Sequence, residues 1–303
     1  MSEATESGCV IESYGRRVVV ARKGGARVAC KLRGRRLEVV AGDVVSIEPD
    51  AVDDDWTVID RLARRNVLRR SDSRGLDESI AANLDQIAIV VAPRPPSDPY
   101  IADRYLAGSA YAGIAAFLIV NKQDLPAEER ELDFLAPLAA AGLTVHRVSA
   151  RNGAGLSELR LALTGRRTLL VGQSGVGKSS LFNVLSGSDI RATRTLSEAS
   201  GEGRHTTVSS AILTLPWGEL VDTPGVRDYA PPLVPQRAVQ DGYSEIARLA
   251  GACRFQDCLH QREPACAVRN AVDAGQIAER RYESYRRLLN LMRQLTDRRG
   301  WRA

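Results

Sequence analysis

The segment Gly172-Gln173-Ser174-Gly175-Val176-Gly177-Lys178-Ser179 constrains the fold of this chain more than any other. It follows an apolar run at residues 168–171 and precedes a run with helical spacing at residues 180–185. Between a strand and a helix, such glycines let backbone N–H groups surround phosphate oxygens, the lysine reaches the terminal phosphates, and the serine hydroxyl binds Mg²⁺. The segment therefore predicts a phosphate-binding P-loop, and we assign Gly172 to Ser180 to nucleotide binding. A glycine turn without function would not explain the flanking strand and helix.

Apolar runs alternate with helical runs on both sides of the P-loop, a pattern typical of a mainly parallel sheet covered by helices. The expected strands are residues 86–92, 116–121, 143–149, 168–172, 208–215 and 219–222. The expected helices include residues 127–141 and 178–186. We therefore expect a central α/β domain over residues 76–230.

The N-terminal part, residues 1–75, has a different pattern. Glycine turns separate five short β-rich runs, at residues 15–21, 27–32, 37–40, 43–48 and 56–60. This arrangement predicts a small β-barrel, most simply an OB-fold. Basic residues gather before residue 40, which fits RNA binding and an ordinary solvated surface equally well, and the acidic run Asp53-Asp54-Asp55 argues against a uniformly basic face.

The C-terminal part, residues 231–303, begins with prolines that interrupt the α/β pattern and ends in an expected helix, residues 276–297, with a basic end. Between them, Cys253, Cys258, His260 and Cys266 lie within fourteen residues. Three thiolates and one imidazole fit a single tetrahedral, structural Zn²⁺ site with no open position. The alternative is three buried free thiols and a surface histidine. The other two thiols, Cys9 and Cys30, are expected to be buried.

The sequence Asn121-Lys122-Gln123-Asp124 ends an expected strand and resembles the NKxD motif of GTPases. There the Asp carboxylate accepts from the guanine N1–H and amine, and the Lys stem packs over the base, whereas adenine offers no such donor pair. Among 42 basic residues this chain has four lysines, and two of them stand in the NKxD-like segment and the P-loop: Lys122 and Lys178. A compact ammonium has roles that a planar guanidinium cannot fill, so this placement supports both motifs.

Two further segments resemble GTPase motifs. Ser149-Ala150 follows the next expected strand and resembles the SA motif, whose backbone N–H meets guanine O6. Asp222-Thr223-Pro224-Gly225 resembles the DxxG motif, with Asp222 on Mg²⁺ and the Gly225 amide at the γ-phosphate.

The order of the motifs is unusual. Regular GTPases have the P-loop first and the NKxD and SA motifs last, but here residues 121–124 and 149–150 precede the P-loop. The chain is therefore expected to be circularly permuted, which an α/β domain tolerates when its original termini lie close together. The segment after Gly225 then leads directly into the C-terminal part.

Together, the β-barrel, the permuted motifs and the Cys/His cluster resemble the RsgA/YjeQ family of ribosome small subunit-dependent GTPases, over essentially the whole chain. The matching segments are residues 121–124, 172–180, 203–207, 222–225, 253–260 and 263–266. The family more often has Gly where Ala265 stands. The resemblance implies GTP hydrolysis that is stimulated by the 30S subunit during its late maturation, with the barrel and the zinc module contacting 16S rRNA.

The position after the DxxG-like segment is Val226, which cannot orient a catalytic water as the glutamine of Ras-type GTPases does. The nearest substitute is His205, in a glycine-containing switch I-like loop where Thr206 or Thr207 is expected to meet Mg²⁺. From the residues alone, a catalytic His205 and an exposed, RNA-contacting His205 are equally plausible. The resemblance favours catalysis.

Other classes of protein fit less well. No apolar run approaches the roughly 20 residues of a membrane span, and the first residues do not resemble a signal peptide, so we expect a cytoplasmic monomer with no membrane partner. The net charge of +5 hints weakly at a polyanionic partner. One alternative function is an rRNA-binding assembly factor that uses GTP only as an occupancy switch. A permuted GTPase of the large subunit is less compatible, because those families do not combine this barrel with this cluster.

Overall fold

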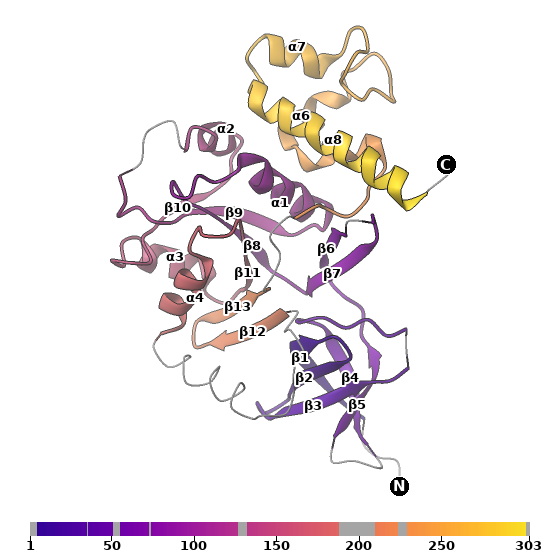
Figure 1. The fold of residues 1–303 in the computed structure, drawn as a ribbon, viewed down its shortest axis with the longest axis vertical. Helices are drawn as coiled ribbons and strands as arrows, with labels where there is room; N and C mark the ends of the chain where they lie inside the picture. The colour runs from indigo at the N-terminus through magenta and orange to yellow at the C-terminus, as the bar shows by residue number, and fades with distance from the viewer. Residues whose placement is uncertain are drawn as a thin grey trace.

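A computed structural model describes residues 5–34, 36–50, 55–72, 74–126, 132–187, 210–223 and 229–300. The molecule is elongated, with a β-barrel at one end, an α/β layer in the middle and a helical part at the other end (Figure 1). None of the helices in these ranges is long and apolar enough to cross a membrane.

Five strands form the N-terminal barrel: β1 (Glu6–Tyr14), β2 (Arg17–Arg22), β3 (Arg27–Leu32), β4 (Val44–Pro49) and β5 (Trp56–Arg61). β1 pairs with β2 and β4, β2 pairs with β3, and β5 pairs with β3 and β4, so the ring of strands is closed. Buried aliphatic residues fill the barrel, among them Val10, Val20, Val45, Ile47 and Val58. The expected five-stranded barrel is confirmed.

Two details of the expected barrel are wrong. β1 was not expected, because Gly8 and polar residues interrupt its apolar pattern; Gly8 is needed there, since a Cβ atom would lie 2.4 Å from Val20 Cγ1. Residues 37–40 are not a strand. Their valines are buried, but the amide of Val40 donates to the Asp43 carboxylate at 2.9 Å, so this segment is a packed loop.

The central sheet has the order β10-β9-β8-β11-β13-β12, and all neighbours are parallel except β12 and β13. Its strands are β8 (Gln86–Val91), β9 (Ala115–Val120), β10 (Val145–Arg147), β11 (Arg167–Val171), β12 (Ser210–Leu215) and β13 (Gly218–Asp222). The accompanying helices are α1 (Pro99–Tyr111), α2 (Leu135–Ala140), α3 (Leu156–Leu163) and α4 (Lys178–Ser186). The expected strands are thus confirmed, although β10 is shorter than residues 143–149. Within its described residues, the expected helix 127–141 is α-helical only as α2, because residue 132 is in 3-10 conformation and residues 133–134 form a turn. Residues 127–131 lie outside the described residues.

Alternating residues of each strand build two cores, one on each face of the sheet. On β8, Ile87 and Ile89 belong to the core that includes Tyr105 of α1, whereas Ala88 and Val90 belong to the core shared with α3 and α4. Helices cover both faces of the sheet, so a ligand can reach it only at its edges. The polar residues that follow the strands lie at the carboxyl edge, where α/β sheets bind ligands.

Two connections join the barrel and the central sheet. β1 pairs with β12 at Glu12–Ala211 and Ser13–Ser210, which makes one sheet continuous through both parts. A separate hairpin, β6 (Val67–Ser71) with β7 (Asp77–Ala82), follows the barrel; it was not expected from the sequence.

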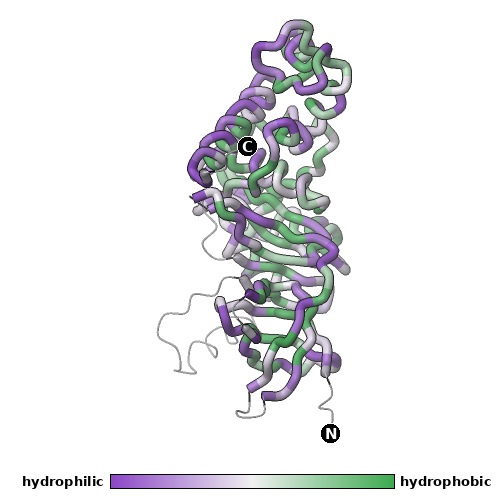
Figure 2. The backbone as a smooth tube through the Cα atoms, turned by 90° about the vertical axis from the view of Figure 1, so that its right-hand side faces the viewer, coloured by the Kyte–Doolittle hydropathy of each residue, from purple (hydrophilic) through white to green (hydrophobic). Residues whose placement is uncertain are grey.

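The C-terminal part consists of η2 (Gln236–Gly242), α6 (Ser244–Ala250), α7 (Ala267–Asp273) and α8 (Glu279–Arg299). The expected C-terminal helix is confirmed as α8, within two or three residues at each end. Hydrophilic and hydrophobic residues alternate along it (Figure 2), as expected for a helix with one buried face. That face packs on η2 and α1, so the C-terminal part packs against the first helix of the central layer.

Candidate nucleotide and metal sites

The NKxD-like, SA-like and P-loop segments meet at one pocket of about 440 Å³. It lies at the carboxyl ends of β9, β10 and β11, and its lining residues are Asn121, Lys122, Asp124, Leu125, Ala150, Arg151, Gly177 and Ser180. The permuted order of the motifs predicts that these three segments lie together, although up to about sixty residues separate them in the sequence, and in the structure they do.

The P-loop glycines are needed for backbone geometry. Gly172 has φ +138°, and a Cβ atom there would lie 2.2 Å from the carbonyl oxygen of Val90. Gly177, the N-cap of α4, has φ +94°, and its Cβ atom would lie 2.3 Å from Asn121 Nδ2. Any other residue at these positions would open the loop.

Lys178 lies folded over the P-loop. Its Nζ donates to the carbonyl oxygens of Gly172 at 2.7 Å and Gln173 at 2.8 Å. Burial lowers the pKa of this ammonium and the nearby charge of Asp222 opposes that shift. The lysine is thus held on the loop whose amides are expected to surround the phosphates.

Asn121 links the three segments. Its buried side chain donates from Nδ2 to the carbonyl oxygen of Val176 at 3.0 Å, and its Oδ1 accepts from the amide of Ala150 at 3.1 Å. The amide of Ala150, one of the two that the SA resemblance offers to guanine O6, is therefore already bonded within the protein.

Lys122 forms one wall of the pocket. Its Nζ donates to the carbonyl oxygens of Arg94 and Gly175, both at 2.7 Å. Because the ammonium is fixed at both carbonyls, the aliphatic stem is held beside the pocket, where a base can pack on it.

Asp124 is the acceptor in the pocket. Its Oδ1 accepts from the Ser149 hydroxyl at 2.6 Å, and this hydrogen bond lowers the pKa of the carboxyl group. The carboxylate therefore stays ionised at neutral pH and offers an acceptor to a ring N–H and an amine on one edge of a base. Guanine has that pair of donors and adenine does not.

The residues expected around Mg²⁺ are described in part. Ser179 is exposed at the first turn of α4, and Asp222 ends β13, the neighbour of β11. A hydroxyl and a carboxylate are ligand types that Mg²⁺ accepts alongside phosphate oxygens. The other expected residues, His205, Thr206, Thr207 and Gly225, lie outside the described residues.

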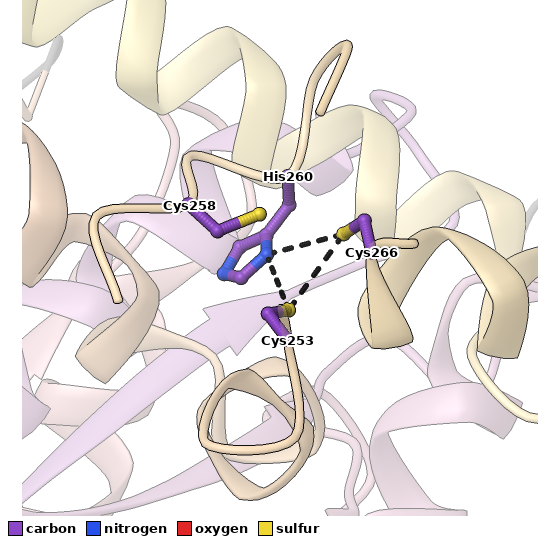
Figure 3. Close-up of side chains that lie close together, drawn as sticks. All are labelled: Cys253, Cys258, His260 and Cys266. Atoms are coloured by element: carbon purple, nitrogen blue, oxygen red, sulfur yellow. Dashed lines mark hydrogen bonds between the residues drawn. The ribbon is translucent and has the colours of Figure 1, made fainter. Parts of the chain in front are cut away.

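Cys253, Cys258, His260 and Cys266 converge in the C-terminal part (Figure 3). Their ligand atoms all lie within 4.8 Å of one another. The Sγ atoms of Cys253 and Cys266 are 3.8 Å apart, and His260 Nδ1 lies 3.5 Å and 3.4 Å from them. A tetrahedral Zn²⁺ with bonds of about 2.3 Å to sulfur and 2.0–2.1 Å to nitrogen would place such atoms about 3.8 Å and 3.5 Å apart. The four residues therefore fit a closed zinc site, and the alternative of a surface histidine is wrong because His260 is buried.

Two residues around the cluster support it. Gln240 Oε1 lies 2.8 Å from His260 Nε2, so Nε2 carries the proton and Nδ1 is left as a lone pair facing the thiols. Burial lowers the pKa of His260, which keeps the imidazole in the neutral form that binds metals. The carboxylate of Glu263 accepts from the amides of Leu259, Gln261 and Arg262, which fixes the loop between two ligands.

Several neighbours of these sites were not predicted from the sequence. Arg151 follows the SA-like segment directly and could have been found from that position. Gln240, twenty residues before His260, carries no such signal in the sequence. Neither does Arg94, whose contribution to the nucleotide pocket is a backbone carbonyl.

Comparisons with known proteins agree with this geometry. The model of the RsgA GTPase family matches residues 61–231. The Small ribosomal subunit biogenesis GTPase RsgA of Azotobacter vinelandii is 41% identical over 293 residues, covering 94% of this chain and 85% of that protein. The protein of the same name from Pseudomonas aeruginosa strain LESB58 is 40% identical, covering 95% and 86%.

Two solved structures share the fold. YjeQ from Thermotoga maritima matches with a TM-score of 0.73 at 29% identity, over 95% of this chain and 99% of that one. YloQ, described as a circularly permuted GTPase, matches with a TM-score of 0.70 at 22% identity, over 97% and 96%. The second likeness concerns the fold alone.

Proposed function

Since this chain belongs to the RsgA GTPase family and is a circularly permuted GTPase, we propose that its GTP hydrolysis is coupled to late maturation of the 30S ribosomal subunit. The relatives that cover most of this chain are named for small ribosomal subunit biogenesis. The observation that carries the guanine part of the proposal is the Asp124 carboxylate, which accepts from the Ser149 hydroxyl inside a pocket that Lys122 also lines.

In this proposal each part of the pocket has one task. Asp124 accepts from the guanine N1–H and amine, while Asn121 keeps the P-loop and the SA-like segment together. The amides of Gly172 to Ser180 and the ammonium of Lys178 hold the phosphates. Ser179 and Asp222 hold Mg²⁺, which supplies positive charge to the β- and γ-phosphate oxygens. The Gly225 amide senses the γ-phosphate, and Thr206 or Thr207 binds Mg²⁺.

We assign orientation of the attacking water to His205. The proposal rests on the sequence, because Val226 has no polar side-chain atom and His205, in the switch I-like loop, is the nearest candidate substitute. His205→Ala should abolish 30S-stimulated hydrolysis while GTP affinity and 30S binding stay nearly unchanged. Stimulation that survives in the variant, or that disappears together with 30S binding, would remove the catalytic role.

We further propose that the barrel and the zinc module contact 16S rRNA, that the parts divide at residues 1–75, 76–230 and 231–303, and that the protein acts as a cytoplasmic monomer. The metal in the Cys/His cluster is assigned as one structural zinc because the ligand set is complete and soft.

The decisive experiment measures GTP turnover with purified 30S particles, with 50S particles and with neither. Stimulation by 30S alone is the expected result. If 30S particles bind the GTP form but leave turnover unchanged, the alternative of an occupancy switch holds. Equal stimulation by 50S particles would contradict the assignment to the small subunit.

A further inference from the structure

Tyr229 is the first described residue after the DxxG-like segment, and it is completely buried. Its hydroxyl donates to the carbonyl oxygen of Arg69 on β6 at 2.9 Å, and its ring stacks on Tyr105 of α1 with the ring centroids 4.2 Å apart. Four peptide bonds separate Tyr229 from Gly225. Because an extended chain spans at most about 3.6 Å per residue, the two Cα atoms lie within roughly 14 Å of each other. The place of Tyr229 therefore limits where the Gly225 amide can lie.

The two residues after Tyr229 are bonded to the same strand. Ser71, the last residue of β6, donates its amide to the carbonyl oxygen of Ala230 at 2.9 Å and its hydroxyl to that of Pro231 at 3.1 Å. These two hydrogen bonds and that of the Tyr229 hydroxyl hold residues 229–231 along β6. The chain that leaves the DxxG-like segment is therefore attached to the β6–β7 hairpin.

The hairpin is in turn attached to the barrel, and it lies between the barrel and the C-terminal part (Figure 1). Arg64, between β5 and β6, donates from Nε and Nη2 to the two carboxylate oxygens of Asp43 at 2.7 Å and 2.8 Å, and from Nη1 to Ser79 Oγ on β7 at 3.3 Å. Asp43 belongs to the barrel, because its carbonyl oxygen accepts from the amide of Val10 on β1. The side chains of Arg64 and Asp43 are 8% and 0% exposed, so water does not screen this bidentate pair. A displacement of the barrel therefore moves the hairpin.

A second connection reaches the other end of the DxxG-like segment. β1 of the barrel pairs with β12, and β12 pairs with β13, which ends at Asp222. This connection consists of backbone pairing within one sheet. The connection through the hairpin depends on side-chain hydrogen bonds of Tyr229 and Ser71, which single substitutions can remove without breaking the sheet.

We propose that the β6–β7 hairpin couples binding of the 30S particle at the barrel to GTP hydrolysis, with Tyr229 as the positioning residue that passes the coupling to the DxxG-like segment. This inference rests on the proposed function and deepens it by naming the path of the stimulation. When the particle binds the barrel, the hairpin moves with the barrel, and Tyr229 brings the Gly225 amide into its place at the γ-phosphate. Tyr229 acts through the main chain and is not a catalytic residue.

The experiment uses the full chain and measures GTP turnover over a range of concentrations of purified 30S particles. Tyr229→Phe keeps the stacked ring and removes the bond to Arg69, and Ser71→Ala removes the hydroxyl bond to Pro231. Each variant should lower the turnover at saturating 30S roughly 3- to 10-fold, which corresponds to the net contribution of one neutral hydrogen bond. The 30S concentration at half-maximal turnover and the Kd for GDP should stay within twofold, because neither residue lines the nucleotide pocket.

Tyr243→Phe is the matched control. Tyr243 is also completely buried, and its hydroxyl lies 3.2 Å from Ser284 Oγ within the C-terminal part. The substitution therefore removes an equally buried hydroxyl that has no bond to the hairpin. The turnover at saturating 30S should stay within about 1.5-fold of the wild type.

Three results would overturn the coupling through the hairpin. One is an unchanged turnover at saturating 30S in either Tyr229→Phe or Ser71→Ala. Another is an equal loss in Tyr243→Phe, which would indicate a general loosening of the protein. The third is a higher 30S concentration at half-maximal turnover with no loss at saturation, which would indicate weaker 30S binding alone. A wild-type protein that 30S particles do not stimulate would instead contradict the proposed function itself.

Discussion

The Asp124 carboxylate is the group that we propose selects the base. It is supported by a hydroxyl that the sequence also predicts, since Ser149 belongs to the SA-like segment, and the two meet at 2.6 Å. The hydroxyl of Ser149 lowers the pKa of the Asp124 carboxyl group and fixes its position. In the proposed function, recognition of guanine therefore depends on both residues.

Asp124→Asn should weaken GDP binding roughly 10- to 100-fold, because the amide replaces a charged acceptor and places an N–H group against the donors of guanine. Xanthine carries a carbonyl where guanine carries the amine, so the variant should gain affinity for XDP. Calorimetry with GDP and XDP measures both changes. Unchanged GDP affinity would show that another group reads the base.

Ala265 lies beside Cys266 of the Cys/His cluster with φ +54°, a left-handed conformation that costs a non-glycine residue about 1–2 kcal/mol. The glycine that the resemblance leads one to expect here would adopt this φ without that cost. Ala265→Gly should stabilise the C-terminal part by up to about 1 kcal/mol, since relief of strain exceeds the extra entropy of an unfolded glycine. Chemical denaturation followed by the fluorescence of a zinc indicator measures this. A less stable variant would mean that the alanine methyl group makes a contact worth more than the strain.

At the scale of elements, the sequence predicted what depends on local pattern. The strands of the central sheet and helix α8 are found close to their expected positions, because long apolar runs and helical spacing survive in any context. β1 and the β6–β7 hairpin were not predicted, because key residues in them make contacts with residues that are distant in the sequence. Gly8 allows the close approach of Val20, and Ser71 bonds to Ala230 and Pro231. Such tertiary contacts leave no periodic pattern in the sequence.

The contact between α1 and α8 is ionic and buried. Asp103 of α1 is fully buried and accepts from Arg280 at 2.8 Å and from Arg281 at 2.5 Å, and Arg281 also meets Glu245 of α6 at 2.5 Å. Removing one partner leaves buried charge uncompensated, so Asp103→Ala should lower the free energy of unfolding by about 3–5 kcal/mol. Urea denaturation of this variant tests the value.

The exposed pair Arg287–Glu283 on the same helix provides the control. Glu283→Ala should change the free energy of unfolding by less than about 0.5 kcal/mol. Equal effects of the two substitutions would show that the buried cluster does not hold α8 on α1.

The same cluster gives the stability a pH dependence. Burial alone would raise the pKa of Glu245, but the hydrogen bonds and charge of Arg281 outweigh it, and the net pKa lies below the ordinary value of 4.5. Because the folded pKa is the lower one, this stabilisation is complete above pH 4.5 and is lost as the pH falls through the folded pKa. Unfolding midpoints between pH 7 and pH 3 should therefore drop less steeply in Glu245→Gln than in the wild type. Parallel curves would show that another carboxylate dominates.

In the whole molecule, circular permutation places the C-terminal part directly after the DxxG-like segment. The described chain resumes at Tyr229, whose ring stacks on Tyr105 of α1 at 4.2 Å and whose hydroxyl donates to the carbonyl oxygen of Arg69. Gly108 makes room for this ring, because a Cβ atom there would lie 2.0 Å from the hydroxyl oxygen. The chain that leads from the nucleotide site into the C-terminal part is thus anchored to the central layer by Tyr229, and to the β6–β7 hairpin by Tyr229, Ala230 and Pro231.

The C-terminal part should depend on its metal while the nucleotide pocket does not. The ligands belong to residues 253–266, whereas the pocket is built from residues 121–180, which have their own cores. A strong chelator should release one zinc per chain and remove hydrogen-exchange protection after about residue 235, because metal binding and folding of such a module are linked. GDP affinity should remain within about twofold, since no pocket residue contacts the cluster among the described hydrogen bonds.

Cys258→Ser should reproduce the loss of zinc, whereas Cys30→Ser, which removes a buried thiol in the barrel, should keep the zinc. Purified protein without zinc, or GDP binding that disappears with the metal, would contradict the separation of the two sites.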